Sequence, residues 1–148
     1  MNTNTLKRFA QEARTKLREQ VAAKLEEVLH TDSAKLRGKK EILDKLRAEL
    51  DKVGKDSLID RVAYTWFNRF IALRFMDVNE YQVLNTLVLT PLEGAVSPEI
   101  LAKAQTGSVA DELMSLEEKK QLLQLFTNSS NTNPENDVYS ILLVAVCN

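Results

Sequence analysis

VAYTWFNRFIALRFMDVN, residues 62–79, is the stretch that decides the fold, because it gathers five of the nine aromatic residues of the chain into one helical segment. Leu58, Val62, Trp66, Phe70 and Leu73 follow one another at helical spacing, and a second apolar row lies beside them. A helix that is apolar on most sides has to be surrounded by other helices. We therefore expect this helix to be the innermost one, with Tyr64 and residues 66–75 largely inaccessible to solvent.

Two amphipathic helices are predicted before the aromatic helix. Apolar residues recur at intervals of three and four from Asn4 to about Leu29, and again up to about Val53, where Gly54 is a plausible C-cap. Asp56 or Ser57 is expected to cap the aromatic helix. Residues 1–79 are therefore predicted to form a three-helix layer.

The second half of the chain is predicted to be less regular. Residues 80–97 are rich in aliphatic and β-branched residues and are expected to form an irregular or short extended segment. Residues 98–148 are expected to form short helices, one of which opens with a capping box made by Ser115 and Glu118. The predicted fold is all-α, or nearly so, a bundle of about five or six helices.

Composition limits the classes of protein to which the chain can belong. Its 148 residues are 44% hydrophobic and 28% charged, which suits one globular domain or a helical module of a larger protein. A membrane span and an apolar signal segment are not expected, so a cytoplasmic location is predicted. One histidine and one cysteine give no metal-ligand cluster. Cys147 is expected to be a small buried hydrophobic residue, with a reactive thiol as the alternative.

Charge is divided along the chain. Residues 1–55 carry 14 Lys and Arg against 9 Asp and Glu, and residues 56–148 carry 6 against 12. Basic residues of the first part can follow a DNA backbone without reading its sequence, or can simply solvate amphipathic helices. The candidate DNA-backbone contacts are Lys7, Arg8, Arg14, Arg18, Lys35, Arg37, Lys39 and Lys40.

Arg69 and Arg74 are charged residues within the aromatic helix. One interpretation is that each pairs with Asp60 or Asp77 or emerges at a helix interface. The other is that Asn68, Arg69 and Arg74 dock a further part of a larger protein.

The amino-acid sequence of the aromatic helix resembles that of a known family. Residues 64–69, YTWFNR, and residues 72–79, ALRFMDVN, together with residues 4–14 and 142–148, are similar to the N-terminal region of the PglX-type adenine-specific DNA methyltransferases of BREX phage-defence systems. Members of that family are many times longer than 148 residues. The resemblance therefore implies an N-terminal helical module, truncated at Asn148, that supports a catalytic domain and contacts double-stranded DNA or other defence proteins.

The chain lacks the sequence motifs for the methyl transfer that the resemblance implies. The three prolines are never adjacent and the four glycines lie far apart, so an Asn-Pro-Pro-Tyr-like segment and a glycine-rich cofactor loop are missing. S-adenosylmethionine is implied for the longer protein, and the chain itself is expected to be non-catalytic and free of cofactor.

Two alternatives remain open. The uncharged run of residues 138–147 is compatible with a free-standing helical adaptor that binds a protein partner through this run. The basic N-terminal part is compatible with a helical domain that binds nucleic acid by itself.

Overall fold

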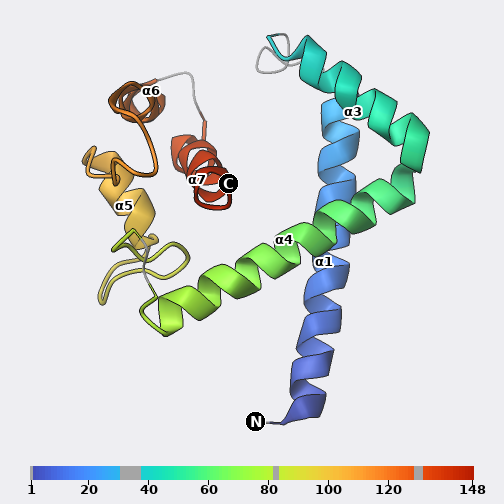
Figure 1. Ribbon diagram of the computed structural model, residues 1–148, viewed down its shortest axis with the longest axis horizontal. Helices are drawn as coiled ribbons and strands as arrows, with labels where there is room; N and C mark the ends of the chain where they lie inside the picture. Colours follow the sequence, from blue (N-terminus) through green and yellow to red (C-terminus); the bar gives the residue numbers. More distant parts are fainter. Residues whose placement is uncertain (1, 31–37, 82–83, 129–131) are drawn as a thin grey trace. The chain divides into compact units, whose positions relative to one another are not determined.

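The computed structural model describes residues 2–30, 38–81, 84–128 and 132–148, and within these the fold is all-α, as predicted. Residues 84–98 contain only an isolated bridge between Pro91 and Pro98 and no strand, so the irregular interpretation of this segment is confirmed. The helices are α1 (Thr3–His30), α3 (Lys40–Val53), α4 (Lys55–Val78), α5 (Glu99–Gln105), α6 (Leu116–Thr127) and α7 (Pro134–Val146) (Figure 1).

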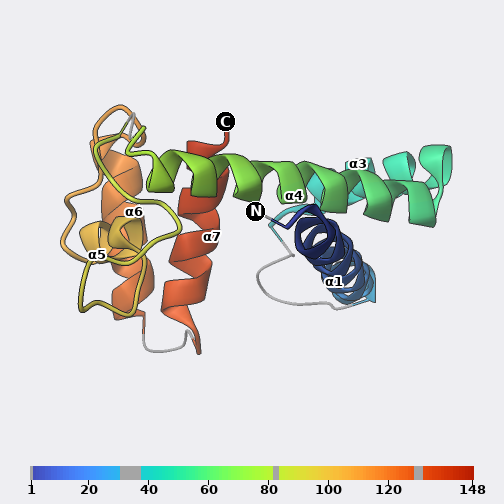
Figure 2. The same cartoon turned by 90° about the horizontal axis from the view of Figure 1, so that it is seen from below.

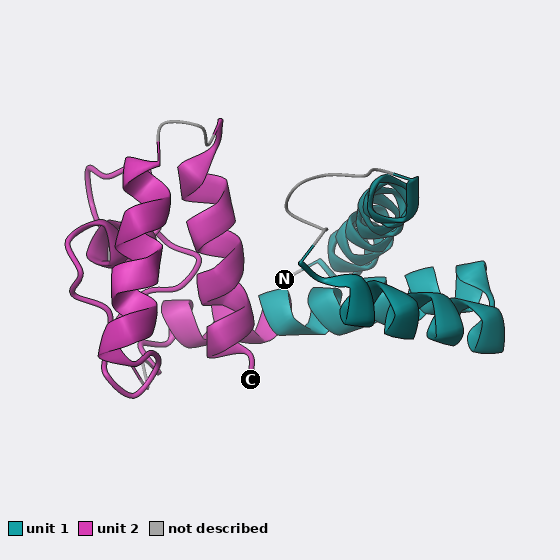
Figure 3. Ribbon diagram, turned by 90° about the horizontal axis from the view of Figure 1, so that it is seen from above, with its two compact units in different colours: residues 1–70 teal, residues 71–148 magenta. Residues whose placement is uncertain are grey.

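The chain divides into two compact units (Figure 3), residues 1–70 and residues 71–148. Unit 1 contains α1, α3 and the larger part of α4. Unit 2 contains the end of α4, the irregular segment and α5 to α7. The aromatic helix therefore contributes to two cores, and each is described by itself.

Unit 1 is built from three long helices. The chain changes direction at Gly54, whose φ of 83° lies in the left-handed region that favours glycine and whose N–H donates to the Leu50 carbonyl. Gly54 is thus the C-cap that the sequence predicts. Helix α1 crosses α4 (Figure 1), and Leu25, Ile59 and Ala63 are buried between the helices of this unit.

The helices of unit 1 leave an open groove between them. This apolar groove of about 320 Å³ lies among residues of α1, α3 and α4, including Leu25, Leu46 and Trp66. Exposed ion pairs also link the helices of unit 1. Arg61 Nη2 lies 2.8 Å from Glu49 Oε1, and Lys55 pairs with Glu26. The hydrogen bond from Lys55 lowers the pKa of the Glu26 carboxyl.

The predicted burial of the aromatic helix is wrong for several of its residues. Tyr64 and Phe75 are each 58% exposed and Ile71 is 48% exposed, whereas Ala63 and Leu73 are buried. The helix itself carries apolar side chains on most of its sides. In each unit, however, few helices pack against its part of α4. Only one side of each part is covered, so the aromatic helix is not the innermost element throughout.

Unit 2 has a tighter core. Helices α5, α6 and α7 pack against one another, with α6 and α7 side by side (Figure 2), and Ile100, Val138 and Leu142 are fully buried among them. Ser115 and Glu118 form the predicted capping box at the start of α6. Helix α7 starts at Pro134, four residues before the uncharged run of residues 138–147, because Asn133 caps it and proline suits a first helical position.

Carboxylates hold the irregular segment of unit 2. The Val88 N–H donates to Asp77 Oδ1 at 2.9 Å, and the N–H groups of Leu89 and Thr90 donate to Asp77 Oδ2 at 2.8 and 3.0 Å. The preceding N–H, that of Leu87, donates to Glu99 Oε2 at 2.8 Å. A buried backbone N–H group needs a hydrogen-bond acceptor. These two carboxylates supply acceptors for four successive N–H groups in place of a neighbouring strand.

Side chains hold the same segment from its other side. Tyr139 of α7 donates its hydroxyl to the Val88 carbonyl at 3.0 Å, and Lys103 of α5 donates to the Asn85 carbonyl at 2.8 Å. Burial, and then the nearby Asp77 carboxylate, raise the pKa of the Tyr139 phenol. The irregular segment is therefore fastened to α4, α5 and α7.

Replacing Asp77 should loosen this segment. Asp77→Ala leaves three backbone N–H groups and the Thr90 hydroxyl without their acceptor, so we expect the free energy of unfolding to fall by about 2–4 kcal/mol. Urea unfolding followed by circular dichroism measures the change. Glu93→Gln, in the same segment but exposed, is the matched control and should change stability by less than about 0.5 kcal/mol. Equal effects of the two variants would contradict the anchoring role of Asp77.

Glu99 should make unit 2 sensitive to acid. Burial alone would raise the pKa of its carboxyl, but the Leu87 N–H and the Lys103 ammonium, 2.9 Å from Glu99 Oε1, outweigh burial and hold the pKa below its ordinary value of 4.5. A carboxyl with a lowered folded-state pKa stabilises the fold above its unfolded-state pKa, and this stabilisation is lost as the pH falls through the folded-state pKa.

Glu99→Gln should therefore cost about 1–2 kcal/mol at neutral pH, with the difference from the wild type shrinking from about pH 5 downward. Urea unfolding at several pH values tests this. The exposed Glu112→Gln serves as the control. A difference between wild type and Glu99→Gln that stays constant down to pH 3 would show that the charge of Glu99 does not stabilise the fold.

Candidate functional site

The basic residues of α1 differ in their surroundings. Lys7 is exposed, Arg8 Nε lies 3.7 Å from Glu12 Oε1 one turn on, and Arg18 pairs with Asp60 of α4. These are exposed pairs, which contribute little to stability. Two of the predicted DNA contacts, Lys35 and Arg37, lie outside the described residues.

Lys39 and Lys40 stand at the beginning of α3 and are exposed. The N-terminal end of a helix carries the positive end of its dipole, where cations are unfavourable. The side chain of Lys39 makes no capping hydrogen bond. The stability of α3 therefore does not explain why two lysines stand at this end.

Arg14 lies against aromatic rings of α4. Its guanidinium carbon is 4.9 Å from the centre of the Phe67 ring and 5.9 Å from that of Tyr64. An arginine over a ring face is held by attraction to the ring quadrupole and keeps its outward N–H groups available. Among the described residues no carboxylate lies within 4 Å of Arg14, so its charge is not compensated by an ion pair.

The arginines of the aromatic helix bind other groups than the two aspartates expected. Arg69 stacks over Trp66, with 5.0 Å between its guanidinium carbon and the ring centre, and Arg74 donates to the Thr90 hydroxyl at 2.5 Å. Asp60 pairs with Arg18, and Asp77 binds the irregular segment. The predicted carboxylate pairing of Arg69 and Arg74 is therefore wrong. Asn68 is exposed, and the docking role of Asn68, Arg69 and Arg74 stays a prediction.

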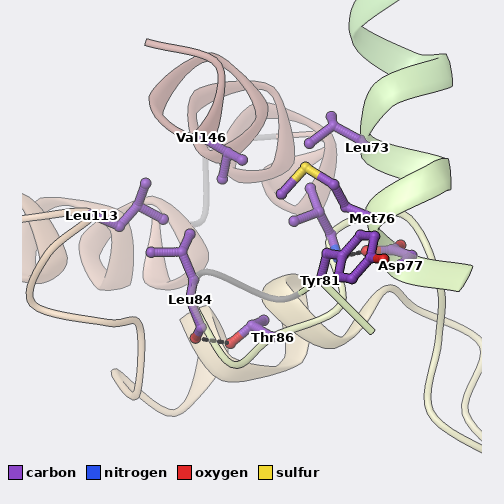
Figure 4. Close-up of a pocket in the computed structure, with 9 residues that line it drawn as sticks. Leu73, Met76, Asp77, Tyr81, Leu84, Thr86, Leu113 and Val146 are labelled. Carbon is purple, nitrogen blue, oxygen red and sulfur yellow. Dashed lines mark hydrogen bonds between the residues drawn. The ribbon is translucent and has the colours of Figure 1, made fainter. Parts of the chain in front are cut away.

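Unit 2 contains a pocket of about 210 Å³ between the end of α4 and α7 (Figure 4). Its lining is mostly apolar, with Met76, Leu113 and Val146 among it. Two of its polar groups are already bound, since Asp77 accepts from the irregular segment and the Thr86 hydroxyl donates to the Leu84 carbonyl at 3.0 Å (Figure 4). Tyr81 also lines the pocket, so the described lining offers mainly apolar contact.

Other kinds of site lack the necessary residues in the described part of the chain. No group of three or more His, Cys, Asp or Glu side chains there is placed to hold a metal ion. None of the helices drawn in Figure 1 has the length and apolar character that crossing a bilayer would take. Cys147 is half-buried, less than the sequence predicts.

Sequence reasoning missed the most strongly bonded polar residues. Asp77 and Glu99 bind backbone N–H groups that lie 11 to 13 residues away in the chain, and helical periodicity carries no signal for such contacts. The stacking of Arg14 on Phe67 and Tyr64 was also missed. One signal was available for Asp77, since a carboxylate at the end of a strongly apolar helix needs hydrogen-bond partners if it is buried.

Comparison with known proteins shows homology to adenine-specific methyltransferases. A stretch of 47 residues, 32% of the chain, is 53% identical to the adenine-specific methyltransferase PglX of Lacticaseibacillus casei (strain Zhang), and covers 4% of that protein. Over 99% of the chain, 26% identity is found to the adenine-specific methyltransferase BrxX of Escherichia coli O9:H4 (strain HS), of which 14% is covered. The chain thus spans a small fraction of the length of the curated relatives it matches.

No protein-family model matches the chain. No solved structure matches it either.

Proposed function

We propose that this chain is the N-terminal helical region of a site-specific DNA adenine N6-methyltransferase in a BREX-like phage-defence system. The similarity to BrxX along 99% of the chain carries the proposal, and the 53% identity to PglX over 47 residues strengthens it. In this proposal the region is non-catalytic, supports the catalytic domain and contacts double-stranded DNA. The remainder of the longer protein, not this region, binds S-adenosylmethionine.

The chemistry of the described side chains agrees with a region that supports a catalytic domain and contacts DNA. The pocket of unit 2 is apolar, and the bonded carboxylates, Asp77 and Glu99, hold backbone N–H groups. The excess of basic charge lies in unit 1, where residues 1–70 carry 16 Lys and Arg against 11 Asp and Glu. Positive charge suits contact with the DNA backbone.

The free-standing adaptor has less support. Its predicted binding surface was the apolar run of residues 138–147, but Val138 and Leu142 are fully buried in the core of unit 2. Ile141 and Val144, 40% and 44% exposed, remain as the larger apolar side chains of α7 available to a partner.

The reading frame that encodes the chain provides the first test. We expect it to continue beyond Asn148 and to encode a glycine-rich cofactor loop and an Asn-Pro-Pro-Tyr-like segment, which hold the methyl donor and the flipped adenine. Sequencing the source DNA decides this. A stop codon directly after Asn148 would contradict the proposal and leave the adaptor as the better interpretation.

Methylation by the whole protein provides the second test. Cells that express the full frame should carry N6-methyladenine at a defined DNA sequence, and deletion of residues 1–148 should abolish this methylation or reduce it strongly. Single-molecule sequencing of genomic DNA measures it. Substitution of the asparagine in the Asn-Pro-Pro-Tyr-like segment is the control for loss of catalysis. Undiminished methylation after the deletion would exclude the supporting role.

A further inference from the structure

We propose that unit 1 contacts the phosphate backbone of duplex DNA through one face of α1, made by Lys7, Gln11 and Arg14 and completed by Tyr64 of α4. This surface is called the Arg14 face below. The inference rests on the proposed function for the choice of DNA as the partner, and it states which of the many basic residues carry the contact.

The geometry of α1 separates the Arg14 face from its other basic residues. At 3.6 residues per turn, Lys7, Arg14 and Arg18 fall within about 40° of one another around the helix axis, and Gln11 lies beside them. The four glutamates of α1, at positions 12, 19, 26 and 27, lie at least about 80° from this row. The row is therefore free of acidic neighbours from its own helix.

Arg8 and Lys16 belong to other faces of α1. Arg8 projects about 100° away from Lys7 and has Glu12 as its partner, while Lys16 lies on the side opposite to Lys7. Glu12 and Glu19 lie one helical turn from Lys16 on either side. Because carboxylates of the same helix lie near both residues, Arg8 and Lys16 should attract a phosphate less than Lys7 and Arg14 do.

Helix α4 holds Arg14 in place for such a contact. The rings of Phe67 and Tyr64, 4.9 and 5.9 Å away, support the guanidinium without using its hydrogen-bond donors. Tyr64 is 58% exposed, so its hydroxyl can also donate to a phosphate oxygen. On the same row Arg18 is paired with Asp60, which leaves Lys7 and Arg14 as the charges for DNA.

The spacing of these two charges fits a duplex. Lys7 and Arg14 are separated by seven residues, which is about 10.5 Å along the helix. A stretch of duplex of that length carries about six phosphate charges, so both side chains can reach phosphates at once. The charge of unit 2, 4 Lys and Arg against 10 Asp and Glu over residues 71–148, makes that unit the less suitable one for DNA.

The experiment is a titration of a fluorescently labelled mixed-sequence duplex with the 148-residue chain, followed by polarisation at several salt concentrations. The test variant is the double substitution Lys7→Ala and Arg14→Ala. We expect the slope of log K against log salt to lose about two units in magnitude, because each lost phosphate contact contributes about 0.9. Circular dichroism confirms that the variant keeps its helices.

The matched control is the double substitution Arg8→Ala and Lys16→Ala, which removes the same charge from other faces of the same helix. It should change the slope by less than half as much.

A second pair of variants tests whether the Tyr64 ring supports Arg14. Tyr64→Ala should weaken binding about two- to fivefold by releasing Arg14, whereas Tyr64→Phe, which keeps the ring, should weaken it less.

Equal losses for the two double variants would overturn the inference, because the contact would then be diffuse. Absence of any duplex binding by the folded chain at low salt would overturn it as well. The first result leaves the proposed function unchanged. The second would remove DNA contact from it, but not the assignment to a methyltransferase, which the downstream reading frame tests separately. Conversely, a stop codon after Asn148 combined with the expected slopes would leave the Arg14 face as the DNA contact of a free-standing protein.

Discussion

Two carboxylates order a segment that has no regular secondary structure. Asp77 and Glu99 accept hydrogen bonds from the four successive N–H groups of Leu87, Val88, Leu89 and Thr90. In most proteins such a run of aliphatic and β-branched residues would satisfy its backbone in a sheet. Here side chains at the end of α4 and the start of α5 replace the missing strand, and they fasten the segment to the helices of unit 2.

The helices themselves follow from local sequence signals. The apolar periodicity of α1, the glycine after α3 and the Ser115 and Glu118 pair at α6 each act within a few residues, so they could be predicted. Burial could not be predicted in the same way. The aromatic helix is apolar on most sides, but exposure depends on how many helices pack against it, and Tyr64 and Phe75 remain exposed.

The sequence predicts which basic residues are candidates for the site, but not which groups lie next to each of them. Arg14 and Arg18 both stood among the basic residues expected to face DNA, yet one is stacked on aromatic rings and the other is paired with Asp60. These partners lie 42 to 53 residues away in the chain, beyond the reach of helical spacing. Charge balance points to the first part of the chain, and only the structure separates the unpaired basic residues from the paired ones.

The division of charge matches the division into compact units. Residues 1–70 carry an excess of five basic residues and residues 71–148 an excess of six acidic ones. Units of opposite net charge are suited to neighbours of different charge, which agrees with the proposal that unit 1 contacts DNA. The tight core and bonded polar groups of the second suit a supporting part of a larger protein.

The most direct measurement is an amide-resolved NMR titration of the chain with a mixed-sequence DNA duplex. If unit 1 contacts DNA through the Arg14 face, the largest shifts should fall on Lys7, Arg14 and Tyr64, while the N–H signals of residues 87–90 stay unchanged. Shifts concentrated in unit 2, or spread evenly over the basic residues of α1 and α3, would contradict this assignment.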